Sequence, residues 1–279
     1  IMSYKIVVDS GCDLPDKLRE DEHFVVVPLT LSVGGVDIID DEKFDQKDFI
    51  KRVDEAKECP KSACPSPERY LSEYESAQGD VYVITLSGRL SGSYNSALVA
   101  ADMYEEDGGS NRVHVFDSMS ASCGEALIAM KIVECEGQGM GFDDVVKTVT
   151  QFCNGMKTYF VLETLETLRK NGRLTNLQAL LANVLSIKPV MGAREGEIIK
   201  LEQTRGLNKA LKRMCEIITE NVSEPENKVL GIAHCNCPER AEYVKSLLVE
   251  KNNFKDVIIV NTAGIATMYA NDGGIIVTV

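Results

Sequence analysis

One stretch of the sequence decides how the rest of the chain is arranged: Val81-Tyr-Val-Ile-Thr-Leu-Ser-Gly-Arg-Leu-Ser-Gly-Ser-Tyr-Asn-Ser96. Its first residues are apolar, aromatic and β-branched, which predicts a buried strand. The middle is rich in Ser and Gly, and apolar residues at helical spacing then predict a helix over residues 94–103. The first amides of a helix lack intrahelical partners and can bind an anion. The loop is therefore a candidate anion site, with a tight turn before a capped helix as the alternative.

The same order of strand, polar loop and helix occurs twice more in the first half of the chain. One apolar run ends in Asp9-Ser10 and another ends at Ser118. A helix is predicted after each, the first with Asp13 as its N-cap. Strands that alternate with helices predict a parallel sheet with helices on both faces. Ligands of such sheets bind at the carboxyl ends of the strands, so we expect Asp9, Ser10 and Ser118 near Ser91.

The pattern changes near residue 155. A hairpin over residues 188–201 is mixed with further strand–helix units, which predicts a sheet of mixed direction. We therefore expect an α/β protein of two domains. Residues 1–155 would form a parallel-sheet, three-layer α/β/α domain, and residues 156–279 a smaller mixed-sheet α/β domain.

Three segments carry more local predictions. Residues 24–31 are expected to form one continuous strand. Residues 59–67 contain three prolines, which deny them both helix and ladder hydrogen bonds, so no regular structure is expected there. Residues 177–187 are strongly apolar and predict a helix, which would be either a wall of a ligand tunnel or part of the ordinary core.

Composition excludes several classes of protein. The net charge of −13 disfavours binding to a phosphate backbone, so no nucleic acid is expected. No apolar run approaches the roughly 18 residues that span a bilayer, so no membrane span is expected. The nine cysteines are scattered and odd in number, which favours free thiols in a reducing cytoplasm.

Several enzyme signatures are missing. There is no Gly-x4-Gly-Lys-Ser/Thr phosphate loop and no Gly-x-Ser-x-Gly turn. A serine hydrolase also needs a general base, and the chain has only three histidines. The segment His234-Cys-Asn-Cys237 offers soft metal ligands but no second pair to complete a tetrahedral set, so no metal is expected.

Basic residues gather in Leu168-Arg-Lys-Asn-Gly-Arg173. Cations near a helix C-terminus are favourable on their own account, which is the structural interpretation. The functional interpretation is a contact with an anionic ligand or a partner through Arg169 and Arg173. The sequence leaves the two open.

These segments together resemble the DegV family. The resemblance rests on Val8-Asp-Ser10, Pro60-Lys-Ser-Ala-Cys-Pro-Ser-Pro67, Leu90-Ser-Gly-Ser-Tyr-Asn-Ser-Ala97, Phe116-Asp-Ser118, Leu168–Arg173 and Ile187-Lys-Pro189, in the family's order and over nearly the whole chain. Members are similar in function to the fatty-acid-binding subunit of bacterial fatty acid kinase. The resemblance implies that one long-chain fatty acid, such as palmitate, stearate or oleate, is buried between two α/β domains. It also implies presentation to a separate kinase subunit that makes an acyl phosphate, with no catalysis by this chain and no other cofactor.

The resemblance also assigns residues. It places the fatty-acid carboxylate at Ser62 and at Ser91 with the Gly92 amide, and a basic partner contact at Arg205. The family usually carries a histidine where this chain has Ala270. Tyr269 or Asn271 would then have to substitute for it as a head-group neighbour.

An apolar ligand of this kind agrees with the energetics. Burial of one methylene is worth about 0.8 kcal/mol, so about sixteen carbons contribute roughly 12 kcal/mol before ordering costs. The hydroxyls then need only orient the head group. Two other functions stay open from the sequence: a serine-dependent hydrolase or transferase that uses Ser91, and a regulator that binds a phosphate or a sugar at the same helix.

Overall fold

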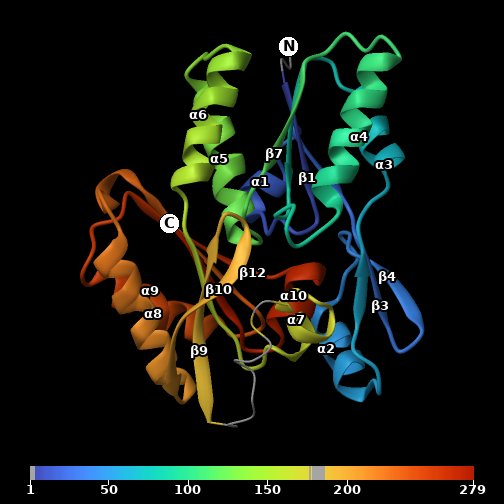
Figure 1. Cartoon of the computed structure of the whole chain (residues 1–279). Helices are drawn as coiled ribbons and strands as arrows, with labels where there is room; N and C mark the ends of the chain where they lie inside the picture. The colour runs from blue at the N-terminus through green and yellow to red at the C-terminus, as the bar shows by residue number, and fades with distance from the viewer. Residues whose placement is uncertain (1–3, 176, 178–185) are drawn as a thin grey trace.

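The computed structural model describes residues 4–175, 177 and 186–279. Three sheets organise these residues: a parallel sheet at one end, a mixed sheet at the other, and a small antiparallel sheet beside them (Figure 1). The predicted α/β class is confirmed, with a parallel sheet and a separate mixed sheet. The division of domains at residue 155 remains a prediction.

The parallel sheet has the strand order β2-β1-β6-β7. Its strands are β1 (Tyr4–Asp9), β2 (Phe24–Val27), β6 (Asp80–Thr85) and β7 (Val113–Asp117), and all neighbouring pairs run parallel. One face is covered by α3 (Pro67–Glu75) and α4 (Ser93–Glu106), the other by α5 (Cys123–Gly137) and α6 (Phe142–Gly155) (Figure 1). Alternate residues of each strand feed the two cores. Val7 and Val83 face α3 and α4, whereas Ile6 and Ile84 face α5 and α6.

The mixed sheet has the order β10-β9-β8-β13-β11-β12. Its strands are β8 (Thr158–Val161), β9 (Ile187–Arg194), β10 (Glu197–Arg205), β11 (Val229–His234), β12 (Asp256–Asn261) and β13 (Ile275–Thr278). The predicted hairpin is β9–β10, with its turn at Glu195 and Gly196, both at positive φ. The helices α8 (Leu207–Asn221) and α9 (Pro238–Val249) cover one face.

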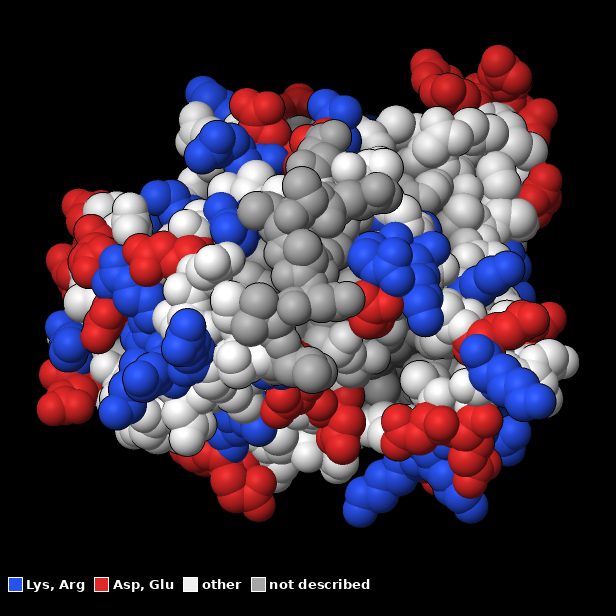
Figure 2. Space-filling view, turned by 60° about the horizontal axis from the view of Figure 1, so that its bottom comes forward, with Lys and Arg blue, Asp and Glu red and all other residues white. Residues whose placement is uncertain are grey.

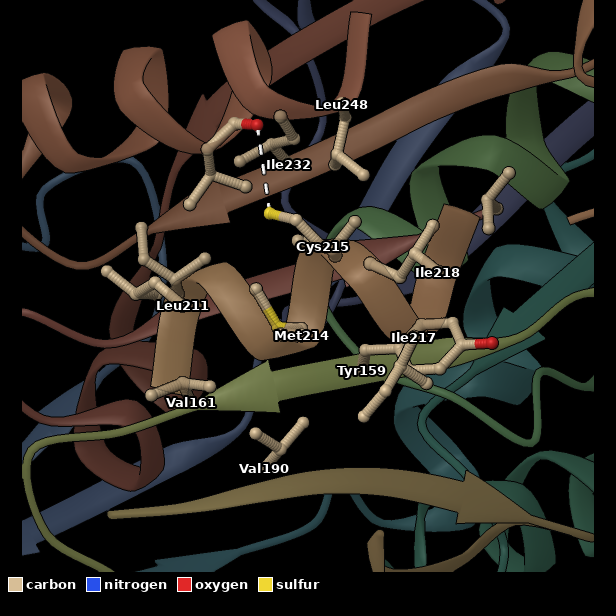
Figure 3. Close-up of a cluster of buried hydrophobic side chains, with 14 of the residues drawn as sticks. Tyr159, Val161, Val190, Leu211, Met214, Cys215, Ile217, Ile218, Ile232 and Leu248 are labelled. Carbon is tan, nitrogen blue, oxygen red and sulfur yellow. Dashed lines mark hydrogen bonds between the residues drawn. The ribbon is translucent and has the colours of Figure 1, made fainter. Parts of the chain in front are cut away.

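Tyr159 and Val161 of β8 lie in this core (Figure 3), where Leu211, Met214 and Ile218 of α8 pack against the sheet. Because side chains alternate along a strand, the other residues of β8 point to the opposite face, toward the parallel-sheet half of the chain.

The third sheet was not predicted. Pro28 and Leu29 separate β2 from β3 (Thr30–Val33), so the expected single strand over residues 24–31 is wrong. The strand β3 pairs with β4 (Val36–Ile39) and with β5 (Lys61–Ala63). The short β5 shows that residues 59–67 are not wholly irregular, because the prolines flank the three paired residues and leave their amides free to pair.

The remaining helices are short or follow this small sheet. They are α1 (Asp16–Arg19), α2 (Gln46–Glu55), α7 (Glu166–Lys170) and α10 (Gly264–Ala270). The expected N-cap is wrong: Pro15 stands at the N-cap of α1, and Asp13 binds elsewhere. The predicted helix over residues 177–187 lies mostly outside the described residues. Among the helices that the structure describes, none has the length and apolar character to cross a membrane.

Candidate functional site

A cavity of about 110 Å³ lies between the two larger sheets. Its walls come from the loops after β6 and β7, from the mixed sheet, from α10 and from the small sheet. Most of the lining is apolar: Leu29, Leu86, Leu90, Met119, Ala121, Phe160, Leu162, Leu168, Ala193, Ile198, Ile265, Ala266, Ala270 and Ile276. The space therefore suits a long apolar group.

The alternation of β8 builds one wall. Thr158 and Phe160 line the cavity, and so does Leu162 directly after the strand, while Tyr159 and Val161 point to α8. Two residues advance a strand by about 6.6 Å, so the wall extends about 13 Å along the chain.

Polar groups gather at one part of the lining. The Ser62 Oγ lies 3.3 Å from the Tyr269 hydroxyl, and the Arg173 guanidinium lies over the Tyr269 ring with its Cζ 5.8 Å from the ring centroid. Arg173 Nε donates to the Leu90 carbonyl oxygen at 3.0 Å, which fixes the guanidinium beside the loop that carries Ser91. Ser62, Ser91, Arg173 and Tyr269 all line the cavity.

Ser91 stands just before α4, as the sequence predicts. Its Oγ accepts from the Ser93 amide at 3.2 Å and lies 3.1 Å from the Ser93 Oγ. Gly92 is the N-cap of α4, and a Cβ there would lie 2.9 Å from Cys64 Sγ. The glycine therefore permits the chain after β5 to pack over this turn.

The three predicted arginines differ in their surroundings. Arg173 is half-buried in the cavity wall. Arg169 is exposed and pairs with Glu166, at 3.0 and 2.8 Å. Arg205 is exposed at the end of β10. Arg173 and Arg169 differ because of the turn at Gly172, which has φ +74° and ends α7. After this turn, Arg173 lies on the cavity side.

Four predicted head-group neighbours lie outside the residues that line the cavity. Asp9 accepts the Gly11 and Leu86 amides, and the Ser10 Oγ accepts the Leu29 amide. The Ser118 Oγ accepts the Ser120 amide, and the Asn271 side chain bonds to Thr164, Thr167 and Tyr269. Each of the four is thus occupied in holding a loop. Of the two candidates to replace the family's histidine, Tyr269 lines the cavity and Asn271 does not.

Two buried carboxyl groups from the first half of the chain bind the start of α10. Asp40 accepts the amides of Gly264 at 2.7 Å and Ile265 at 2.8 Å. Asp13 accepts the Ala263 amide at 2.6 Å. Negative groups at a helix N-terminus are favourable, so these contacts fix the helix that carries Tyr269 into the cavity.

Burial dominates the titration of these carboxyl groups. Desolvation raises the pKa of Asp13 to about 7 and that of Asp40 to about 6. It also raises the pKa of Asp9 to about 6 and that of Glu125 well above its ordinary value. Neither oxygen of Glu125 has a hydrogen-bond partner among the described residues, which favours its neutral form.

A second polar pair, which the sequence did not predict, lines the cavity. The Ser120 Oγ and Thr158 Oγ1 lie 2.6 Å apart, and both side chains are buried. They come from the loop after β7 and the first residue of β8. No local sequence signal links two residues of different sheets.

None of the three histidines is placed to serve Ser91 as a base. His23 binds Asp21 at 2.7 Å, His114 packs on Phe116 with ring centroids 4.5 Å apart, and His234 Nδ1 accepts the Cys237 amide at 3.1 Å. No cluster of metal-ligating side chains occurs in the part of the chain that the structure describes. Figure 2 shows acidic and basic side chains interspersed over one face, without a wide field of either sign among the described residues.

Comparison with known proteins gives consistent results. A family profile described as an uncharacterised protein of the DegV family matches residues 3–278. A DegV domain-containing protein of Streptococcus pneumoniae is 32% identical, over 99% of this chain and 98% of its own.

Solved structures are also similar. A DegV family protein of Ruminococcus gnavus with vaccenic acid is 46% identical, covers 100% of both chains and has a TM-score of 0.97. The fatty acid kinase B3 protein of Streptococcus pneumoniae, loaded with linoleic acid, is 31% identical, covers 99% of both chains and has a TM-score of 0.89. With a match of this extent to the family profile, the sequence and the fold together establish that this chain belongs to the DegV family.

Proposed function

We propose that this protein binds one long-chain fatty acid in the cavity and has no catalytic activity of its own. The observation that carries the proposal is the charge of the lining. Among the described lining residues, Arg173 is the one charged side chain, and no described carboxylate lies within 4.0 Å of its guanidinium. Its guanidinium donates to the backbone carbonyl oxygens of Leu90 and Asn171, which are neutral, so a ligand anion would supply the missing negative charge. An anionic group on a long apolar chain matches both parts of the cavity.

The carboxylate of the ligand would lie among Ser62, Ser91, Tyr269 and Arg173, with the Gly92 amide as a further donor. Hydroxyl groups and an amide are neutral donors, and Arg173 adds a charge-assisted hydrogen bond. Ala270 contributes only a methyl group to the lining. The Tyr269 hydroxyl is therefore the donor that this chain offers in place of the family's histidine.

The apolar lining would supply most of the affinity. Each buried methylene contributes about 0.8 kcal/mol, and the side chains that line the cavity are already in place in the folded protein. The relatives agree in ligand class, because the Ruminococcus protein holds vaccenic acid and the streptococcal protein holds linoleic acid.

The likeness to a fatty acid kinase B3 protein supports a second part of the proposal, that the bound acid is presented to a separate kinase subunit. Arg169 and Arg205 are exposed and would contact that partner. A division into domains at residue 155, with the acid between them, and a cytoplasmic location belong to the same proposal. The hydrolase alternative has no histidine base placed for Ser91 among the described residues, and a sugar or phosphate regulator leaves the apolar lining unexplained.

The test combines identification of a bound acid with one pair of variants. Mass spectrometry of the denatured, freshly purified protein should reveal an acyl chain of about sixteen to eighteen carbons, since the two relatives hold vaccenic and linoleic acids. Titration with oleate should then show that Arg173→Met weakens binding about thirtyfold, because a charge-assisted hydrogen bond is worth about 2 kcal/mol. Arg169→Met is the matched control and should leave oleate affinity unchanged. Absence of any acyl chain together with no binding of oleate would overturn the proposal.

A further inference from the structure

The pair of Ser120 and Thr158 is unusual because it places two hydroxyl groups in an otherwise apolar part of the cavity lining. Ser120 is 4% exposed and Thr158 is 9% exposed. Their oxygens lie 2.6 Å apart, which is a short hydrogen bond between hydroxyls. Neither residue belongs to the group formed by Ser62, Ser91, Arg173 and Tyr269.

The pair has one hydrogen more than it can use. Two hydroxyl groups carry two donor hydrogens, and the bond between them employs one. Among the described residues, no other hydrogen bond is formed by the Ser120 Oγ or by the Thr158 Oγ1. Whichever group donates, the other therefore keeps one hydrogen without an acceptor among the described residues. A buried donor without an acceptor is unfavourable, and an acceptor on a ligand would relieve it.

The strand β8 gives the position of the pair along the cavity. Leu162 and Ala270 belong to one buried cluster, and Tyr269, one of the polar residues of the lining, packs against that cluster. Thr158 lies four residues before Leu162, which corresponds to about 13 Å along a strand. An extended alkyl chain advances about 1.3 Å per carbon, given its bond lengths near 1.5 Å. The pair is thus about ten carbons away from the level of Leu162, near the middle of a chain of sixteen to eighteen carbons.

We propose that Ser120 and Thr158 select acyl chains that carry a hydrogen-bond acceptor near their middle. This inference rests on the proposed function and specifies the ligand class of the same cavity. The acceptor can be the π electrons of a cis double bond or the oxygen of a hydroxyl or oxo group. A hydroxyl oxygen is the stronger acceptor, and a double bond forms only a weak contact.

A purely structural role for the pair predicts something different. The bond joins the loop after β7 to the first strand of the mixed sheet, so its loss could loosen both halves of the chain. Such a loss would weaken every fatty acid by the same factor. Selection predicts instead that the ratio between two ligands changes, and this ratio is the quantity to measure.

The experiment compares stearate, cis-9-octadecenoate, cis-11-octadecenoate and 10-hydroxystearate by competition against one fluorescent fatty acid. The proteins are the wild type and the double variant Ser120→Ala/Thr158→Val, which removes both hydroxyl groups and leaves no single unpaired donor. Thr278→Val is the matched control. Thr278 is buried directly opposite Thr158 on the neighbouring strand β13, and it contacts Cys123 rather than the cavity.

The ratio of the affinity for 10-hydroxystearate to the affinity for stearate should be about tenfold higher in the wild type than in the double variant. The ratio of the affinity for either cis monoene to the affinity for stearate should be about threefold higher in the wild type than in the double variant. Thr278→Val should keep the wild-type ratios. Equal ratios in the wild type and the double variant would refute the inference while leaving fatty acid binding intact, whereas failure of all four ligands to bind the wild type would refute the proposed function itself.

A second measurement uses the wild type alone, so it tests the inference even if the double variant does not fold. Hydroxystearates with the hydroxyl at carbons 3, 10 and 16 should bind best when it is at carbon 10. A flat or monotonic dependence on position would contradict a polar contact near the middle of the chain.

Discussion

The loops after β1 and β6 leave the same edge of one parallel sheet and are built from the same kinds of residue, yet they differ in purpose. In the loop after β6, the Ser91 side chain lines the cavity. In the loop after β1, Asp9 and Ser10 turn inward and accept the amides of Leu86 and Leu29. One loop places the Ser91 side chain in the cavity wall, and the other holds its neighbours in place.

The difference teaches that the position of a polar residue at a sheet edge is not enough to assign it to a site. A polar side chain is available for a ligand when it borders a cavity and the folded chain leaves part of its hydrogen-bonding capacity unused. The side chains of the loop after β1 accept hydrogen bonds from the amides of Leu29 and Leu86, which are distant in sequence. The Ser91 side chain of the loop after β6 borders a mostly apolar cavity. Each prediction below tests whether this separation holds.

The largest expected effect is a dependence of stability on pH. Burial raises the pKa of Asp9 and Asp40 to about 6 and that of Asp13 to about 7, whereas an ordinary aspartate has a pKa near 3.8. Between these values the folded protein holds protons that the unfolded chain has released. The free energy of unfolding should therefore fall as pH rises from about 4 to about 7, by up to about 1.4 kcal/mol per unit for each carboxyl group.

Urea unfolding at pH 5, 6 and 7 would measure this slope. Asp13→Asn should reduce it, because one of the raised groups no longer titrates. A stability that stays level or increases between pH 5 and pH 7 would show that these carboxyl groups are not buried as described.

The second effect concerns Asp9 itself. Asp9→Ala leaves the amides of Gly11 and Leu86 without an acceptor, and both lie in the buried part of the loop. We expect the free energy of unfolding at pH 7 to fall by about 2–3 kcal/mol, since each unpaired buried group costs about 1–3 kcal/mol and relief of a buried charge offsets part of that. Asp9→Asn should cost about half as much, because one oxygen remains.

Chemical denaturation of both variants would measure the loss, with the exposed Asp16→Ala as the control. If Asp9→Ala were as stable as the wild type but bound oleate tenfold more weakly, Asp9 would belong to the head-group site after all.

The sequence predicted the part of the site that depends on local order. Ser91 follows a strand and precedes a helix, and Ser62 lies in a segment that the family resemblance marks, so both were found. The helix α10 was not predicted. It has seven residues, and its N-terminal amides are bound by Asp40, which lies more than two hundred residues earlier in the chain.

The same reason explains the other differences. Pro28 divides a run of β-forming residues between two sheets, and the pairing of β5 with β3 depends on where that division leaves the chain. Arg169 and Arg173 look alike in sequence, but a glycine turn separates a surface ion pair from a cavity wall. In each case the structure depends on contacts between segments that are distant in the sequence, and local sequence patterns do not contain these contacts.

The third effect is a difference in oleate affinity between variants of two serines. Ser91→Ala should weaken oleate binding about fivefold, because a neutral hydrogen bond is worth about 1 kcal/mol. It should also lower the free energy of unfolding by about 1 kcal/mol, because the Ser93 amide loses its acceptor. Ser10→Ala should differ from it in affinity. It leaves the buried Leu29 amide unpaired, so we expect a loss of about 1–2 kcal/mol in stability with oleate affinity unchanged.

Fluorescence competition and urea unfolding on the same two proteins would measure both quantities. If both variants lost affinity to the same extent, the two loops would form one site, and the contrast drawn here would fail.

The smallest effect tests which residue stands in for the family's histidine. Tyr269→Phe removes one hydroxyl that lies 3.3 Å from the Ser62 Oγ and keeps the ring beneath Arg173. Oleate affinity should fall only about threefold, because Ser62, Ser91 and Arg173 still bind the carboxylate and a single neutral donor contributes about 0.5–1 kcal/mol. Asn271→Ala should leave affinity unchanged, since its amide bonds to Thr164 and Tyr269 outside the cavity. Isothermal titration resolves a threefold change in affinity. If Asn271→Ala lost more oleate affinity than Tyr269→Phe, the residue that replaces the histidine would be Asn271, in the turn after α10.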